Sequence, residues 1–149
     1  MTLYDLVKEM EDIAASMPAI NMIVEHNVRK LNEYGAVRYG VFAWQQKVHN
    51  VREDMTEYNF TLFYVDRLKQ DATKETSNEL EIQSVGMDTL KNVLKLLGEE
   101  GVEVIDYTLT PFAQKFMDDC AGAWADVTIN APNDDICGSD YTNKDLIII

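Results

Sequence analysis

The residue types that build catalytic and metal sites are scarce in this chain of 149 residues. It has two histidines, and neither His26 nor His49 has a second histidine or a paired carboxylate at ligand spacing. We therefore expect ordinary histidines rather than metal ligands or general bases. No glycine-rich phosphate loop and no serine or cysteine nucleophile motif is present, and the acidic runs lack the alternating ligands of a calcium loop. The sequence predicts no catalytic residue, no cofactor and no bound metal.

Positive charge is also scarce. The chain has thirteen basic and twenty-six acidic residues, which gives a formal net charge of -13. No basic cluster follows the spacing of a phosphate backbone, so we expect neither sequence-specific nucleic-acid binding nor attraction to an anionic membrane surface. No apolar run approaches the roughly 18 residues that a membrane span needs, so no membrane partner is expected.

Cysteine occurs only twice, at Cys120 and Cys137. The chain starts Met1-Thr2-Leu3 without a hydrophobic leader. We expect two reduced thiols in a protein made in the cytoplasm, with a disulfide between them as the alternative.

The middle of the chain predicts a strand, a helix and a second strand. Tyr58–Asp66 carries apolar side chains at both odd and even positions, as in a strand with something packed on each face or with one face against a neighbouring subunit. Ser77–Leu97 has apolar residues three or four apart, which predicts a helix capped by Ser77 or Asn78 and closed by Gly98. Val102–Leu109 is rich in β-branched residues and predicts a strand.

An amphipathic helix is expected at the start of the chain. Apolar residues recur at helical spacing from Leu3 to Met17, and Pro18 stops the pattern. Thr2 and Asp5 stand in the order of a capping box. We expect this helix to turn its apolar face toward the core.

The region between the two helices predicts a long hairpin. Val37–Gln46 has strand character and is expected to pair antiparallel with Tyr58–Val65, because neighbours in sequence are usually neighbours in a sheet. Gly40 marks either a bulge or a close backbone approach. The polar residues Lys47–Glu57 form either an extension of this hairpin or a loop.

Four further features complete the expected fold. Ile20–Val24 predicts a short strand, and Val28–Glu33 one or two helical turns. Pro111 is expected to interrupt strand pairing, since it lacks an amide N–H. Ala123–Ala131 alternates apolar and mostly polar residues, which is typical of a half-buried antiparallel strand.

The sequence therefore predicts an α+β fold: a mainly antiparallel sheet with an N-terminal helix and one long helix packed on it. Residues 1–132 are expected to form a single domain, with 133–149 as a C-terminal extension or inter-subunit strap. This extension ends in four aliphatic residues, Leu146–Ile149. Because such a cluster is costly to leave in water, we expect it either to pair with its own sheet or to dock on another subunit.

The order of elements is similar to that of the tail-completion (tail-terminator) and neck proteins of tailed bacteriophages, which form rings between the head portal and the tail. Four runs resemble small virion proteins of Bacteroides-type and crAss-like phages: Tyr39-Gly40-Val41-Phe42, Tyr58 to Leu68, Leu80-Glu81-Ile82-Gln83-Ser84 and Cys120-Ala121-Gly122-Ala123-Trp124-Ala125. The resemblance covers residues 3–131 and brings no catalytic motif with it.

The resemblance implies a structural virion protein at the head-to-tail junction, assembled in the bacterial host cytoplasm and not an enzyme. Its partners would be identical subunits in a six-fold or twelve-fold ring, together with neck, portal or tail proteins, and the acidic surface would adhere weakly to passing DNA. Residues 47–57 would face a channel or an adjacent ring. We expect these side chains at interfaces: Trp44, Phe112, Phe116, Trp124, Ile147, Ile148 and Ile149.

A different class of function stays open. The chain has the size and aromatic content of a small cytoplasmic ligand-binding or regulatory module, with Tyr58, Tyr64 and Trp44 lining a closed pocket. An enzyme would require a deep polar cleft with a strongly perturbed carboxylate.

Overall fold

The computed structural model describes residues 1–33, 37–69, 73, 76–115 and 119–133. The expected α+β fold is confirmed: this part of the chain contains two α-helices, one 3-10 helix and six strands. In chain order they are α1 (Leu3–Ala15), β1 (Met22–Val24), η1 (Val28–Glu33), β2 (Val41–Gln46), β3 (Asn50–Val51), β4 (Met55–Arg67), α2 (Glu79–Glu99), β5 (Glu103–Lys115) and β6 (Asp119–Pro132). The extension beyond residue 133 lies outside the described residues.

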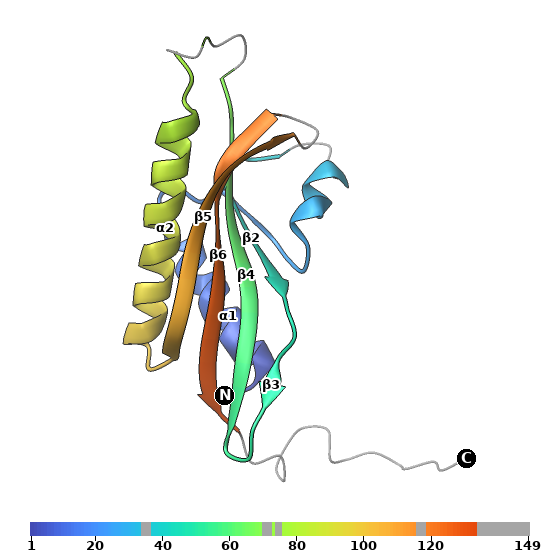
Figure 1. Ribbon diagram of the computed structural model, residues 1–149, viewed down its shortest axis with the longest axis vertical. Coiled ribbons are helices and arrows are strands. Elements are labelled where there is room, and N and C mark those ends of the chain that lie inside the picture. The colour runs from blue at the N-terminus through green and yellow to red at the C-terminus, as the bar shows by residue number, and fades with distance from the viewer. Residues whose placement is uncertain (34–36, 70–72, 74–75, 116–118, 134–149) are drawn as a thin grey trace, which may run out of the picture.

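The sheet runs in the order β1-β2-β4-β6-β5, with β3 pairing on β4 beyond the end of β2. Only β1 and β2 are parallel, and the other pairs are antiparallel. The long strands β4, β6 and β5 stand side by side in Figure 1. The predicted antiparallel pairing of the region before residue 47 with the central strand is confirmed, for example in the pair Phe42 and Tyr64.

Helices α1 and α2 cover one face of the sheet, and η1 covers part of the other. The helices α1 and α2 lie on one face, where Leu6 and Leu90 belong to the same buried cluster as Phe60. On the other face, Val28 of η1 packs with Val65 in a second cluster (Figure 1). The apolar residues on both sides of β4 are therefore accounted for within one chain, at least near η1.

The start of α1 is fixed by the predicted capping box. Thr2 Oγ1 accepts a hydrogen bond from the Asp5 amide at 3.1 Å, and the Asp5 carboxylate accepts one from the Thr2 amide at 3.1 Å. These two bonds satisfy amides that have no partner inside the helix, and they hold the pKa of Asp5 below its usual value.

The predicted end of α2 is wrong by two residues. Gly98 is helical, and the left-handed residue that follows the helix is Gly101, with φ 89°. Both glycines stand near the helix end, so the sequence alone did not separate them. At the other end, Asn78 precedes the helix without a side-chain cap, whereas Ser77 Oγ accepts a bond from the Glu79 amide at 3.2 Å.

Pro111 does not interrupt β5, contrary to the sequence prediction. The strand continues from Glu103 to Lys115, and Pro111 pairs with Ala123. Within the described residues β5 is the outer strand of the sheet and pairs only with β6, so a proline, which lacks an amide N–H, is tolerated there.

The polar region after β2 is a hairpin extension rather than a loop. Its tip is closed by a bond from the Arg52 amide to the Met55 carbonyl, 2.7 Å long. His49 lies behind the tip: its Nδ1 accepts from the Asn59 amide at 3.0 Å, so Nε2 carries the proton and donates to Gln46 Oε1 at 2.9 Å. The strand before it begins at Val41, not at Val37.

Three glycines surround Tyr64 in the middle of β4. A Cβ atom at Gly40 would lie 2.5 Å from the Tyr64 hydroxyl, so the close approach predicted there is confirmed. A Cβ at Gly86 of α2 would lie 2.9 Å from the ring, and one at Gly122 of β6 would overlap the Tyr64 carbonyl oxygen. Burial, together with nearby Asp66, raises the pKa of Tyr64 to about 12. Gly40 and Gly86 thus leave room for the Tyr64 ring, and Gly122 lets β6 approach the Tyr64 backbone.

Candidate functional site

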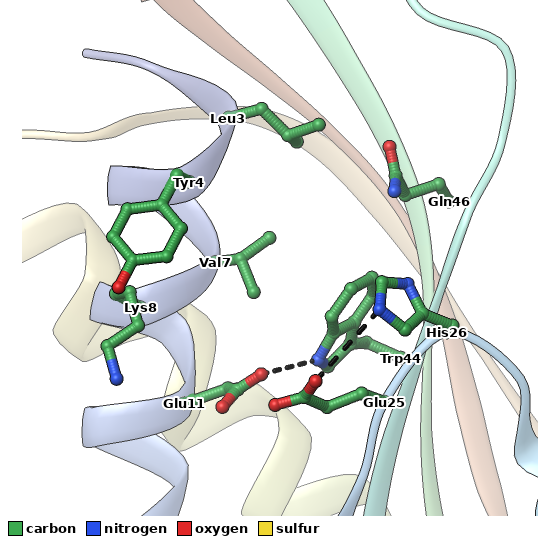
Figure 2. Close-up of a pocket in the computed structure, with 9 residues that line it drawn as sticks. All are labelled: Leu3, Tyr4, Val7, Lys8, Glu11, Glu25, His26, Trp44 and Gln46. Carbon is green, nitrogen blue, oxygen red and sulfur yellow. Dashed lines mark hydrogen bonds and ion pairs between the residues drawn. The ribbon is translucent and has the colours of Figure 1, made fainter. Parts of the chain in front are cut away.

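A pocket of about 350 Å³ opens between α1 and the sheet edge formed by β1 and β2. We call it the α1 pocket, and it is lined by Leu3, Tyr4, Val7, Lys8, Glu11, Glu25, His26, Trp44 and Gln46. Figure 2 shows Leu3 and Val7 pointing from α1 toward the Trp44 indole, while Lys8 points away from it. The pocket therefore has apolar walls and an acidic end.

Trp44 forms the inner wall of the α1 pocket. Its side chain is only 2% exposed, and its ring packs edge-on against Phe60, with ring centroids 6.2 Å apart. The indole Nε1–H donates to Glu11 Oε1 at 3.0 Å, across the space between β2 and α1 (Figure 2). This bond satisfies a buried donor and fixes where the Glu11 carboxylate lies.

The acidic end consists of Glu11 from α1 and Glu25 from the turn after β1. Their side chains converge below the indole in Figure 2. Partial burial raises the pKa of Glu11, the carboxyl of Glu25 raises it further, and the hydrogen bond from Trp44 opposes both. Two carboxyl groups held this close repel one another when both are charged, so they favour either a proton shared between them or a cation.

His26 covers the pocket from the side of the sheet. Its backbone has φ 71°, a left-handed conformation that few residues other than glycine adopt. The ring meets Trp44 edge-on, with centroids 4.7 Å apart, and Nε2 lies 4.0 Å from Glu25 Oε2. The left-handed turn therefore places the imidazole between the indole and the second carboxylate.

The α1 pocket combines charged, aromatic and apolar side chains. The lining offers two carboxylates, an imidazole and an indole, and includes no serine or cysteine nucleophile. Within the described ranges, no group of three or more His, Cys, Asp or Glu side chains is arranged to hold a metal ion. Apolar walls around an acidic end instead fit an organic molecule with a positive group.

A second depression, of about 340 Å³, lies on the opposite face of the sheet beside η1. Its polar side chains already have partners: Asp126 accepts from Lys47 Nζ at 3.1 Å and from Thr61 Oγ1 at 2.9 Å, and Gln45 Oε1 accepts from the Val28 amide at 3.0 Å. The α1 pocket is therefore the better candidate for a ligand.

The residues predicted at interfaces fall in different environments. Trp44 and Phe112 are buried in their own chain, and Trp124 is half-buried with its ring stacked on Phe112, centroids 5.6 Å apart. Little of Trp44 or Phe112 is left for a partner to contact. The other four, Phe116, Ile147, Ile148 and Ile149, lie outside the described residues. An interface role for this set stays a prediction.

The pocket predicted from Tyr58, Tyr64 and Trp44 does not coincide with the α1 pocket. Only Trp44 lines it. Tyr64 is buried against the three glycines, and Tyr58 packs edge-on against His49, ring centroids 5.2 Å apart. These tyrosines belong to different surroundings because they are six residues apart on one long strand.

Sequence reasoning missed Glu11, Glu25 and His26 as pocket residues. One signal was present: Glu11 continues the four-residue spacing of Leu3 and Val7, so a carboxylate stands in an otherwise apolar helical stripe. Nothing comparable marks Glu25 or His26, which reach the pocket only through the pairing of β1 with β2.

Comparison with known proteins adds no relative to this description: no protein-family model matches the chain, and no curated protein matches it. Among the described residues, neither helix has the length and apolar character to cross a membrane. Of the two cysteines, Cys120 is a buried thiol whose Sγ lies 3.6 Å from the Tyr39 hydroxyl, and Cys137 is outside the described residues.

Proposed function

We propose that this chain is a structural virion protein of a tailed phage, which assembles with copies of itself into a ring at the head-to-tail junction. The phage assignment rests on the sequence resemblance described above. Self-assembly is supported by one observation in the fold, the outer edge of β5. The proposal gives the protein no catalytic role; its work would be to hold neighbouring subunits and neighbouring rings together.

The β5 edge is long and apolar in part. The strand has 13 residues and, within the described part of the chain, pairs only with β6. An outer edge offers backbone donors and acceptors to another chain. Beside it, Ile105 is 49% exposed and Tyr107 is 38% exposed, and the adjoining helix α2 exposes Val85. Such a surface gains free energy when a second subunit covers it.

The same edge carries features that limit which partner can pair with it. A register shift interrupts the ladder between Val104 and Asp106, and Pro111 removes a donor farther along. Bulges and prolines are common devices against indiscriminate edge pairing. Between the register shift and Pro111, the stretch from Asp106 to Thr110 is the most regular part of the β5 edge. A short regular stretch favours pairing with one specific neighbour over uncontrolled aggregation.

The hairpin tip at the far end of β4 supports the expected contact with an adjacent ring. Val48 and Val51 are both strongly exposed there, on a projection that reaches beyond the rest of the sheet (Figure 1). Apolar side chains on a projecting hairpin are suited to entering a groove on a different protein.

Light scattering on the purified protein tests self-assembly. We expect a particle several times the chain mass of 17.0 kDa, and a lower mass for the variant Tyr107→Lys, which places a charge on the β5 edge. Leu80→Lys is the matched control, because Leu80 is 77% exposed on α2 but lies outside the β5 strand. A protein that stays monomeric at all concentrations and fails to bind purified portal or neck complexes would contradict the proposed ring assembly.

The α1 pocket favours a second candidate, a small ligand-binding or regulatory module. Its volume of about 350 Å³ lies within the range of small-molecule sites. A monomer that binds a small molecule in this pocket, and shows no affinity for virion proteins, would select this candidate over the ring protein.

A further inference from the structure

We propose that the α1 pocket binds an organic cation, an ammonium or guanidinium group carried on an apolar stem. This inference goes beyond ring assembly and does not depend on it. Three features carry it: the size and walls of the pocket, the pair of carboxylates at its end, and the way Trp44 holds one of them.

The walls suit an apolar stem. Leu3 and Val7 of α1 face the Trp44 indole across the pocket, and together they enclose space for an alkyl chain (Figure 2). Burying such a chain removes apolar surface from water, which favours binding.

The end of the pocket suits a positive head. Glu11 uses one carboxylate oxygen to accept the Trp44 indole N–H, and its carboxyl also makes a hydrogen bond with that of Glu25. Such a contact between two carboxyl groups requires a shared proton, and a cationic ligand would take its place. Glu25 brings a second carboxylate from the opposite side. A guanidinium or ammonium between them would donate hydrogen bonds to two carboxylates, and such charge-assisted hydrogen bonds are stronger than neutral ones.

The surrounding charges agree with this ligand class. His26 touches Glu25 at 4.0 Å, and Lys8 lines the pocket but points away from the indole. An anionic ligand would meet two carboxylates and be repelled. The net charge of -13 over the whole chain also raises the local concentration of cations around the protein.

A tryptophan probe tests the proposal directly. The chain has two tryptophans, so Trp124→Phe leaves Trp44 as the sole indole, and both its fluorescence and its Nε1–H NMR signal report on the pocket. We would titrate this protein with N-acetylargininamide and with N-acetylcitrullinamide, its neutral counterpart of the same shape. We expect saturable changes at Trp44 with the arginine compound and none with the citrulline compound.

Matched variants assign the effect to the carboxylates. In the Trp124→Phe background, Glu25→Gln should weaken binding of the arginine compound at least tenfold, because a charged hydrogen-bond acceptor is lost. Asp12→Asn removes an equal charge from the exposed side of α1 and should leave binding unchanged. Equal affinity for the two compounds, equal affinity of the two variants, or no saturable change at Trp44 would overturn the proposal.

A second arm distinguishes the source of the cation. If the pocket takes a lysine or arginine side chain of a neighbouring copy, Glu25→Gln should also lower the assembly mass measured by light scattering. If it takes a free cation, Glu25→Gln should lose the arginine compound while the assembly mass stays that of the wild type. Because the titration reads Trp44 and not the mass, failure of ring assembly would leave its outcome unaffected.

Discussion

The substitution Gly86→Ala tests how α2 sits on the sheet. Gly86 is a buried position in the middle of α2, and its Cα faces the ring of Tyr64. An added Cβ would stand 2.9 Å from Tyr64 Cδ1 and 3.4 Å from the Ala123 amide nitrogen, which is tighter than ordinary van der Waals contact. Either the ring or the whole helix would have to move.

Two opposing effects determine how much Gly86→Ala changes the free energy of unfolding. Alanine is favoured over glycine inside a helix by about 1 kcal/mol. Overpacking a close-packed site costs about 1–3 kcal/mol. We therefore expect Gly86→Ala to lower the free energy of unfolding by about 1 kcal/mol, since the buried Tyr64 ring packs closely against Gly40 at its hydroxyl end and has little room to yield.

Gly98→Ala is the matched control in the same helix. A Cβ at Gly98 meets no atom within 4 Å, so this variant should gain helix propensity without any clash. We expect it to raise the free energy of unfolding by up to about 1 kcal/mol, measured by urea unfolding followed by circular dichroism. If Gly86→Ala stabilised the protein as much as Gly98→Ala, the close approach of α2 to Tyr64 would be refuted.

Three further predictions concern local features. Gly101→Ala should lower the free energy of unfolding by about 1–2 kcal/mol, because alanine is disfavoured at φ 89°; unchanged urea unfolding would contradict this. Thr2→Ala should cost about 1 kcal/mol through loss of the capping box, and full stability would show that the cap is not formed in solution. Burial lowers the pKa of His49, so the free energy of unfolding should decrease as the pH falls below about 6.5, the pKa of an unfolded histidine. In a His49→Gln variant the free energy of unfolding should change less between pH 7 and 5. Equal pH dependence of the two proteins would contradict the burial of His49.

The secondary structure was largely predictable because it depends on local patterns. The apolar spacing of residues 77–97 and the two-sided apolar run of 58–66 each indicated the right element. The errors arose where position in the sheet decides the outcome. Pro111 is compatible with a strand only at an edge, and nothing in the residues around it says that β5 is the edge.

The α1 pocket could not be assembled from sequence for a similar reason. Trp44 lies on β2, Glu11 on α1, and Glu25 with His26 on the turn after β1. They meet because β1 pairs parallel with β2 and α1 packs over that edge, which are long-range contacts. Only the carboxylate of Glu11, placed in an apolar helical stripe, hinted at a site.

The central claim is that this chain functions by binding copies of itself and neighbouring virion proteins. Electron microscopy of the purified protein mixed with purified portal or neck complexes tests it most directly. We predict closed rings of identical subunits seated on those complexes, with neighbouring subunits meeting at the β5 edge, and loss of the rings in Tyr107→Lys. Isolated single chains that leave the portal and neck complexes bare would contradict the claim.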